Sequence, residues 1–265
     1  MSKVGLALGS GGPRGLAHIG VIKALVENNI SIDVVAGTSA GAVVGGLYLS
    51  LGSIEQVEKI FVDLTLRDLA NIFAGIGRKS GVINGDKLEQ FIEGYVDGML
   101  IEDLRIPFSA IATDVQSGQV IEFTCGSLTR AIRASGSIPG FVDVVNIDSQ
   151  YLVDGGVSEP VPVRTAKKLG AKVVLAVNLD AKNFIDDIFV KNKPLPTTMG
   201  IAAIKLLRYH LAQELCREAE IVIEPDVSGI AWMNMTSYRD RVNIIARGYK
   251  ATMAKMNEIK KIVGK

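Results

Sequence analysis

Short apolar runs alternate with amphipathic segments along this chain, and the alternation predicts strands that are each followed by a helix. Residues 3–8 (KVGLAL), 32–36 (IDVVA) and 172–178 (KVVLAVN) are nearly continuous apolar stretches. Runs of this kind are typical of strands buried on both faces of a parallel sheet. We therefore expect helices to cover both faces of that sheet.

Apolar residues at helical spacing occupy most of the remaining chain. Helices are predicted at residues 15–28, 40–51, 53–64, 86–96, 128–135, 162–169, 198–219 and 235–260. Further strands are predicted at residues 108–114, 119–123, 151–153 and 221–223, the first two being paired around a turn at Ser117 and Gly118. Without repeats or linker-like composition, this pattern predicts one three-layer α/β/α domain over residues 1–265, with a mostly parallel sheet. Residues 198–265 are expected to complete it.

Composition narrows the class of protein. Of 265 residues, 48% are hydrophobic, 22% charged and 6% aromatic, with a net charge of +1. A nucleic-acid-binding protein would show a basic surplus, so we expect no nucleic acid partner. Cys125 and Cys216 lie far apart and fit reduced thiols of a cytoplasmic protein. His18 and His210 are the only histidines, which leaves little material for a zinc site, and we expect no metal.

Two segments raise the question of membrane targeting or insertion. Glycine and proline interrupt the apolar run at the N-terminus, so no signal peptide is expected there. Residues 34–54 carry no charge over a length close to the ~20 residues of a membrane span. They also contain five glycines. A strand, a tight turn and a buried helix account for that pattern more simply.

The first candidate for chemistry is Ser39, in the sequence Gly37-Thr38-Ser39-Ala40-Gly41. This G-x-S-x-G pattern lies between a predicted strand and a predicted helix, where a sharp turn can expose a nucleophilic hydroxyl. Gly37 and Gly41 leave out side chains that would collide at such a turn. The following helix directs its N-terminal N–H groups toward developing negative charge. The alternative is an ordinary glycine-rich turn.

A second glycine-rich run, GSGGPRG, begins at Gly9 and also joins a predicted strand to a predicted helix. Consecutive backbone N–H groups in such a loop can bind an anion, including the oxyanion of an acyl-transfer intermediate. Pro13 has no N–H, which leaves Gly11, Gly12 or Arg14 as donors. A nucleotide-binding loop is the rival interpretation, although Arg14 occupies the place of a third glycine and no P-loop lysine is present.

The third candidate is Asp154, which follows the predicted strand 151–153 and precedes Gly155 and Gly156. A carboxylate can accept the proton of a serine hydroxyl when partial burial raises its proton affinity. The sequence Asp-Gly-Gly also forms ordinary turns, so this motif carries little weight alone.

A Ser-Asp-His triad is the alternative chemistry, since Ser39, Asp154 and His210 follow the order of α/β-hydrolases. His210 lies within a long helical pattern, however, whereas triad histidines usually lie on loops. Ser39 also follows only the second predicted strand. His18, one turn into the first predicted helix, could approach the glycine-rich loop, or it could simply be packed or exposed.

Together the three motifs, G-x-G-x-x-R, G-x-S-x-G and D-G-G, resemble the patatin-like phospholipase family between residue 3 and about residue 179. GLALGSGGPRGLAHIGVIKAL and VVAGTSAGAVVGGLY look like its bacterial branch, and the resemblance places RAIRASGSIPG near the substrate site. Ser10, and Asp-Gly-Gly in place of Asp-Gly-Ala, are mild departures.

The resemblance implies hydrolysis of lipid esters with Ser39 as nucleophile and Asp154 as base. It also implies an oxyanion loop with N–H groups from Gly11, Gly12 and Arg14, and no metal or organic cofactor. The sequence does not name the lipid. The alternative from another class is a binding or regulatory protein that keeps the motifs without turnover.

Two irregular segments combine apolar and cationic residues and could contact a membrane surface. Residues 65–85 and 181–199 carry phenylalanine and isoleucine beside lysine or arginine. That combination suits peripheral contact with anionic lipid at the inner membrane face. We place the expected contact at residues 184–190, as a flap near the site. The alternative is that both segments pack on the sheet edge.

Overall fold

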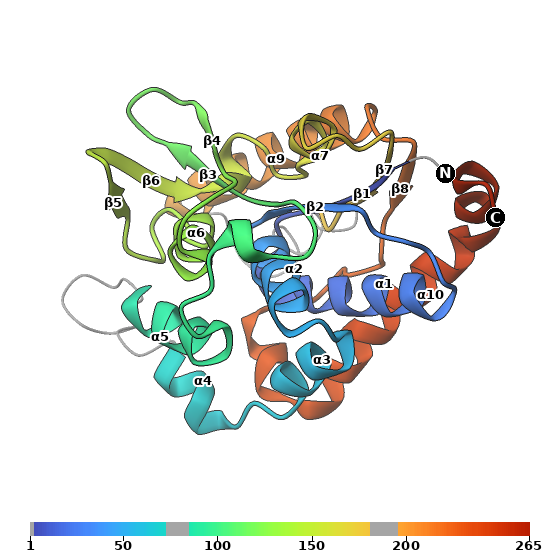
Figure 1. Cartoon of the computed structure of the whole chain (residues 1–265). Coiled ribbons are helices and arrows are strands. Elements are labelled where there is room, and N and C mark those ends of the chain that lie inside the picture. The colour runs from blue at the N-terminus through green and yellow to red at the C-terminus, as the bar shows by residue number, and fades with distance from the viewer. Residues whose placement is uncertain (1–2, 73–84, 181–195) are drawn as a thin grey trace.

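The computed structural model describes residues 3–72, 85–180 and 196–265, which form an eight-stranded sheet with helices on both faces (Figure 1). The strands are β1 (Val4–Leu8), β2 (Val34–Thr38), β3 (Phe108–Asp114), β4 (Val120–Phe123), β5 (Val145–Ile147), β6 (Gln150–Asp154), β7 (Val173–Val177) and β8 (Ile221–Ile223). The sheet order is β5-β6-β3-β2-β1-β7-β8, and β4 pairs with β3 off this path.

Five neighbouring strands, β3-β2-β1-β7-β8, run parallel, and β4, β5 and β6 extend the sheet in antiparallel pairing. The carboxyl ends of β1, β2 and β7 therefore meet at one edge, where ligands bind in open α/β sheets. The predicted three-layer α/β/α fold with a mostly parallel sheet is confirmed.

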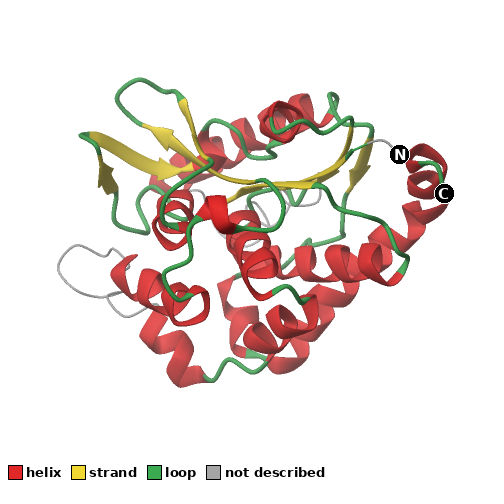
Figure 2. Ribbon diagram, in the orientation of Figure 1, coloured by secondary structure: helices red, strands yellow, loops and turns green. Residues whose placement is uncertain are grey.

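Helices form a layer on each face of the sheet (Figure 2). The α-helices are α1 (Leu16–Glu27), α2 (Ala40–Leu51), α3 (Ile54–Val62), α4 (Leu66–Ile72), α5 (Gly85–Val96), α6 (Leu128–Ser135), α7 (Val163–Lys168), α9 (Pro196–Cys216) and α10 (Tyr238–Val263). Short 3-10 turns include η1 (Gly12–Gly15), η3 (Gly155–Val157) and η5 (Trp232–Thr236).

Side chains of each central strand alternate between two separate cores. In β1, Leu6 and Leu8 join the larger core with α1, α2 and α10, whereas Ala7 faces the smaller core beneath α7 and α9. The smaller core is built mainly from alanine and valine. Helices α7 and α9 can therefore lie close to the sheet on that face.

Helices α1 and α10 cross closely under the larger core, because glycines replace side chains at the crossing. A Cβ atom at Gly20 would lie 1.9 Å from the Ile245 carbonyl oxygen, and one at Gly248 would lie 1.9 Å from the Ala17 oxygen. Both distances are far inside van der Waals contact. The C-terminal helix is thus fixed to the helix that follows the glycine-rich loop.

Most predicted elements are present, with three differences. The strand expected at 32–36 is β2, displaced by two residues, and β5 was not predicted. Residues 65–85 were expected to lack a regular element, but α4 forms at Leu66–Ile72. The rest of that segment up to residue 84, and the flap expected at 184–190, lie outside the described residues. Within the described ranges, no helix is both long and apolar enough to cross a membrane.

Candidate active site

The turn between β2 and α2 holds Ser39 in a backbone conformation that residues with a side chain rarely adopt. Its φ is 55° and its ψ is −119°. The Ser39 N–H donates to the Ser135 hydroxyl at 2.8 Å, which ties the turn to the end of α6. Ser39 is buried at the N-terminus of α2. The predicted strand-turn-helix context of the serine is therefore present.

Both glycines of the G-x-S-x-G motif are needed because α2 lies against the sheet. A Cβ atom at Gly41 would lie 2.1 Å from the Leu8 carbonyl oxygen, and one at Gly37 would lie 2.6 Å from the Ala42 Cα atom. Any side chain at either position would push α2 away from β1 and β2.

Asp154 ends β6 and is buried beside the serine. Its N–H donates to the Ser137 carbonyl at 2.9 Å, and its Oδ1 accepts the Gly156 N–H at 2.7 Å. Burial raises the pKa of the Asp154 carboxyl, while hydrogen bonds from the Ser39 side chain and the Gly156 N–H oppose that rise. The structure thus brings Ser39 and Asp154 together, although 115 positions separate them in the chain.

The two glycines after Asp154 permit close backbone approach. A Cβ atom at Gly155 would lie 2.3 Å from the Ile111 carbonyl oxygen in β3. One at Gly156 would lie 2.9 Å from the Asp154 Oδ1 and from the Ser10 hydroxyl. The Asp-Gly-Gly turn therefore packs against both β3 and the glycine-rich loop.

The glycine-rich loop follows β1 and is anchored at its start. The Gly9 N–H donates to the Val177 carbonyl at 3.1 Å and the Ser10 N–H to the Pro160 carbonyl at 2.8 Å. A Cβ atom at Gly15 would lie 2.3 Å from that of Ala40, so the loop also rests against the residue after Ser39.

One of the three backbone N–H groups that the sequence predicts as oxyanion donors, that of Arg14, is used within the loop itself. The Arg14 N–H donates to the Gly11 carbonyl at 3.2 Å within η1, so it is not directed toward a ligand. Gly11 and Gly12 are the remaining candidates, and the positive φ of Gly12, 54°, favours glycine at that position. The expected Arg14 donor is therefore replaced by a structural contact.

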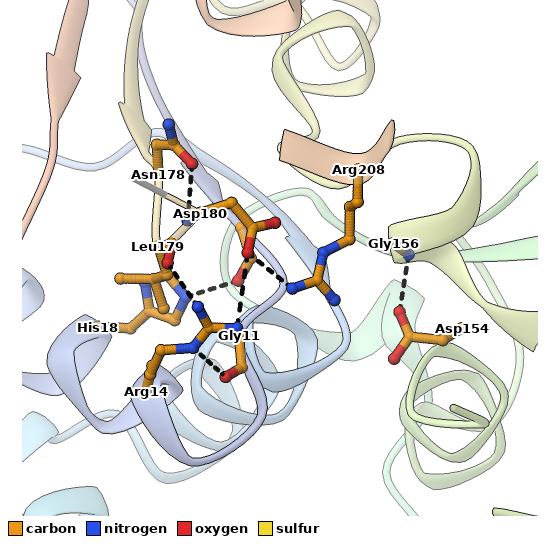
Figure 3. Close-up of polar contacts among 10 residues, drawn as sticks. Gly11, Arg14, His18, Asp154, Gly156, Asn178, Leu179, Asp180 and Arg208 are labelled. Atoms are coloured by element: carbon orange, nitrogen blue, oxygen red, sulfur yellow. Dashed lines mark hydrogen bonds and ion pairs between the residues drawn. The ribbon is translucent and has the colours of Figure 1, made fainter. Parts of the chain in front are cut away.

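The Arg14 side chain braces the loop from beneath, as Figure 3 shows. Its guanidinium donates to the Gly11 and Leu179 carbonyls at 3.1 Å each, and lies 3.5 Å from the Asp180 carboxylate. A second arginine, Arg208 from α9, pairs with the same carboxylate at 2.6 Å. None of the sequence motifs pointed to Asp180 or Arg208.

The two histidines occupy very different positions. His18 is completely buried under the loop, and its Nε2 donates to the Gly9 carbonyl at 2.7 Å. Burial lowers the pKa of His18 to about 4, so the ring is neutral at physiological pH. His210 is exposed on α9 and packs edge-on against Tyr209. Residues two apart on a helix point in nearly opposite directions, so His210 faces away from the side that carries Arg208.

An almost wholly apolar cavity opens beside Ser39. Its volume is about 130 Å³. Besides Ser39 and residues of the glycine-rich loop, it is lined by side chains of α2, α3, α4, α5 and η5 and of the link between α3 and α4, among them Val43, Phe61, Leu64, Phe91, Trp232 and Met235. The buried Arg241 of α10 fixes one wall, since its guanidinium donates to the Val62 and Leu64 carbonyls at 2.9 Å each and to the Met235 carbonyl.

No cluster of three or more histidine, cysteine, aspartate or glutamate side chains that could hold a metal occurs within the described ranges. The polar groups around Ser39 include its own hydroxyl, the Asp154 carboxylate and the backbone N–H groups of the glycine-rich loop. This set is suited to acyl transfer through a serine.

Comparison of the sequence with known families gives one extended match. The family model described as Patatin-like phospholipase matches residues 6–167. An NTE family protein of Mycobacterium tuberculosis is 38% identical over 178 residues, covering 67% of this chain and 49% of that protein. Patatin-like phospholipase domain-containing protein 7 of Rattus norvegicus is 31% identical over 265 residues, covering 89% of this chain and 19% of the rat protein. The chain thus spans about half or less of these relatives.

A solved structure has a similar fold. The crystal structure of VipD from Legionella pneumophila superimposes with a TM-score of 0.65, covering 97% of this chain and 67% of VipD. Sequence identity is 12%, so this likeness concerns the fold alone.

Proposed function

Because the chain belongs to the patatin-like phospholipase family, we propose that it is a serine acyl hydrolase that cleaves ester bonds of lipids through Ser39 and Asp154. The observation that carries this proposal is the contact of the Ser39 side chain with the buried Asp154 carboxylate. The apolar cavity beside Ser39 supports an acyl chain as the group that binds.

In the proposed reaction, Asp154 takes the hydroxyl proton of Ser39 as the oxygen attacks the ester carbonyl. The raised pKa of Asp154 makes its carboxylate a stronger base than an exposed one. Gly11 and Gly12 donate their N–H groups to the oxyanion, and the N-terminus of α2 adds its positive dipole end.

The alcohol then leaves with the proton from Asp154, and an acyl-enzyme remains on Ser39. Water gives a proton to Asp154 as it attacks the acyl carbonyl. The fatty acid leaves, and the proton returns to Ser39. No step needs a histidine, which fits the exposed position of His210.

The test is hydrolysis of a small lipid panel (a lysophospholipid, a diacyl phospholipid and a monoacylglycerol) together with labelling by a fluorophosphonate. We expect Ser39→Ala and Asp154→Asn each to lower turnover by roughly a thousandfold or more, with the double variant little worse. Both variants should keep the wild-type circular dichroism spectrum.

Matched controls are Ser50→Ala in α2 and Asp148→Asn in the β5–β6 turn, which should act like wild type. A folded wild type that neither hydrolyses these lipids nor reacts with the probe would favour a binding protein without turnover. Loss of activity in folded His210→Ala would instead restore the triad. Contact with a membrane surface and a cytoplasmic location stay predictions.

A further inference from the structure

The buried carboxylate of Asp180 lies between the two parts of the candidate site, the glycine-rich loop and Asp154. Asp180 follows β7 at the carboxyl edge of the sheet and is 2% exposed. Its Oδ1 lies 2.6 Å from the Arg208 Nη2 and 3.5 Å from the Arg14 Nη2. The Asp180 N–H donates to the Asn178 side chain at 2.9 Å, which fixes the backbone that carries the carboxylate.

Each arginine reaches a different part of the site. Arg14 holds the Gly11 carbonyl and thereby sets the turn of the oxyanion loop. Arg208 extends from α9 to Asp180, on the side of that carboxylate that faces Asp154, and its charge acts on the Asp154 carboxyl (Figure 3). The segments that carry Arg14, Asp180 and Arg208 are remote in sequence, and they meet only in the folded chain.

Stability alone is a poor reason for this arrangement. Removing ionic groups from water costs free energy that their attraction offsets only with good geometry, and apolar residues often stabilise as well or better. A buried carboxylate shared by two arginines is also a rigid arrangement, since each guanidinium has a fixed fork of donors. The geometry therefore points to orientation of the site.

We propose that Asp180 and Arg208 are positioning residues of the site, in which Asp180 anchors the Arg14 side chain beneath the oxyanion loop and the Arg208 guanidinium beside Asp154. This inference rests on the proposed function, because it assigns Asp154 as the base. The Asp180 carboxylate then determines both the shape of the oxyanion loop and the charge beside the base, Asp154.

The charges around Asp154 allow a test by pH. Arg208 from α9 lowers the pKa of the Asp154 carboxyl, Asp180 raises it, and the remaining partners are the Ser39 hydroxyl and the Gly156 N–H. Since only the ionised base is active, labelling of Ser39 by a fluorophosphonate should rise with pH through the pKa of Asp154. Removing the Arg208 charge should move this rise to higher pH.

The experiment compares wild type with Arg208→Gln, Arg208→Lys and Asp180→Asn by labelling rate between pH 4 and pH 9. We expect Arg208→Gln to move the rise of the labelling rate, which forms the acid limb of the pH profile, to higher pH by roughly one unit. Arg208→Lys should leave this acid limb close to that of wild type. Asp180→Asn should slow labelling at least tenfold at its optimum pH. The matched control is Arg217→Gln, which changes an exposed arginine directly after the end of α9.

An acid limb that stays in place in folded Arg208→Gln would overturn the proposal, as would equal shifts in the Gln and Lys variants. Should Arg208→Gln fail to fold, Arg208→Met carries the same test, because it removes the charge and fills the space. Failure of the proposed function gives a different result: wild type is then not labelled, or is labelled equally without Asp154.

Discussion

Five described residues other than glycine have a positive φ: Asn29, Ser39, Asp97, Asp148 and Ser149. Four of them are exposed turn residues, where this conformation costs little. Ser39 alone is buried and lies at the edge where the motifs meet. Backbone strain that is held in place by surrounding structure is typical of functional residues.

Burial also determines the protonation state of His18. Its Nε2–H holds the Gly9 carbonyl, and its Nδ1 has no partner among the described residues. Since burial lowers the pKa of His18 to about 4, the folded protein keeps the ring neutral where the unfolded chain would protonate it. The sequence left open whether this histidine was packed or exposed.

We predict that His18 makes stability depend on pH. Its contribution is fully present above about pH 6.5 and is lost as the pH falls toward 4, by about 2 kcal/mol at pH 5. His18→Gln keeps a donor for Gly9 and should lose this dependence, whereas the exposed His210→Ala should keep it. Urea unfolding at pH 7 and pH 5 measures the difference, and equal pH dependence of wild type and His18→Gln would contradict the prediction.

At the scale of elements, the glycine-rich loop shows what the sequence could and could not tell. The missing N–H of Pro13 followed from its side chain alone. The use of the Arg14 N–H inside η1 did not, because it depends on the turn that the loop adopts. Gly12 remains as a donor with a left-handed backbone.

The corresponding prediction compares two changes at Gly12 with one at Pro13. Gly12→Ala keeps the N–H and should lose activity only modestly, since a left-handed backbone costs about 1–2 kcal/mol for other residues. Gly12→Pro removes the donor and cannot reach the observed φ, so turnover should fall at least a hundredfold. Pro13→Ala should act like wild type. Equal turnover of folded Gly12→Pro and Gly12→Ala would show that Gly12 is only a spacer.

Helices bounded by clear start and stop residues were predictable, whereas α4 was missed. The bounds of α2 and α6 match the sequence prediction, because α2 begins directly after the G-x-S-x-G serine and ends at Gly52, and α6 begins after the N-cap Ser127 and ends at Gly136. In α4 only Leu69 and Ile72 are buried, which is too few for a visible period. Its signal was the reciprocal cap of Thr65 and Asp68, whose backbone N–H groups each bond to the other side chain.

The β5–β6 hairpin and part of the candidate site were also missed, because neither carries a clear local sequence signal. The hairpin turns through Asp148 and Ser149, both with positive φ, a sequence far less indicative than Asn-Gly. Ser39 and Asp154 carry local motifs and were found. Asp180 and Arg208 have no local motif, since their role depends on contacts between distant segments.

At the scale of the molecule, we propose that the described chain folds as one domain, as its sequence predicts. The C-terminal part contributes β8 beside β7, residues of α9 to the smaller core and α10 to the larger one. Helix α10 meets α1 at the glycine crossing of Gly20 and Gly248.

We predict that Gly20→Ala and Gly248→Ala each lower the free energy of unfolding by about 1–3 kcal/mol, because the added methyl groups push the helices apart. Gly94→Ala in α5 is the matched control: nothing lies within 4 Å of its added Cβ atom, so stability should stay equal or rise slightly. Urea unfolding should be followed by circular dichroism and by activity. Separate transitions for the two probes would contradict a single domain.

The wall of the apolar cavity carries a consequence for how the protein is made. Ser39 and Asp154 precede Trp232, Met235 and Arg241 in the chain, and therefore leave the ribosome before them. Because a domain folds as a unit, neither the Ser39–Asp154 pair nor the cavity wall is complete until α10 has been synthesised and has packed against α1. On this order of events, the proposed binding of an acyl chain has to wait until α10 has packed.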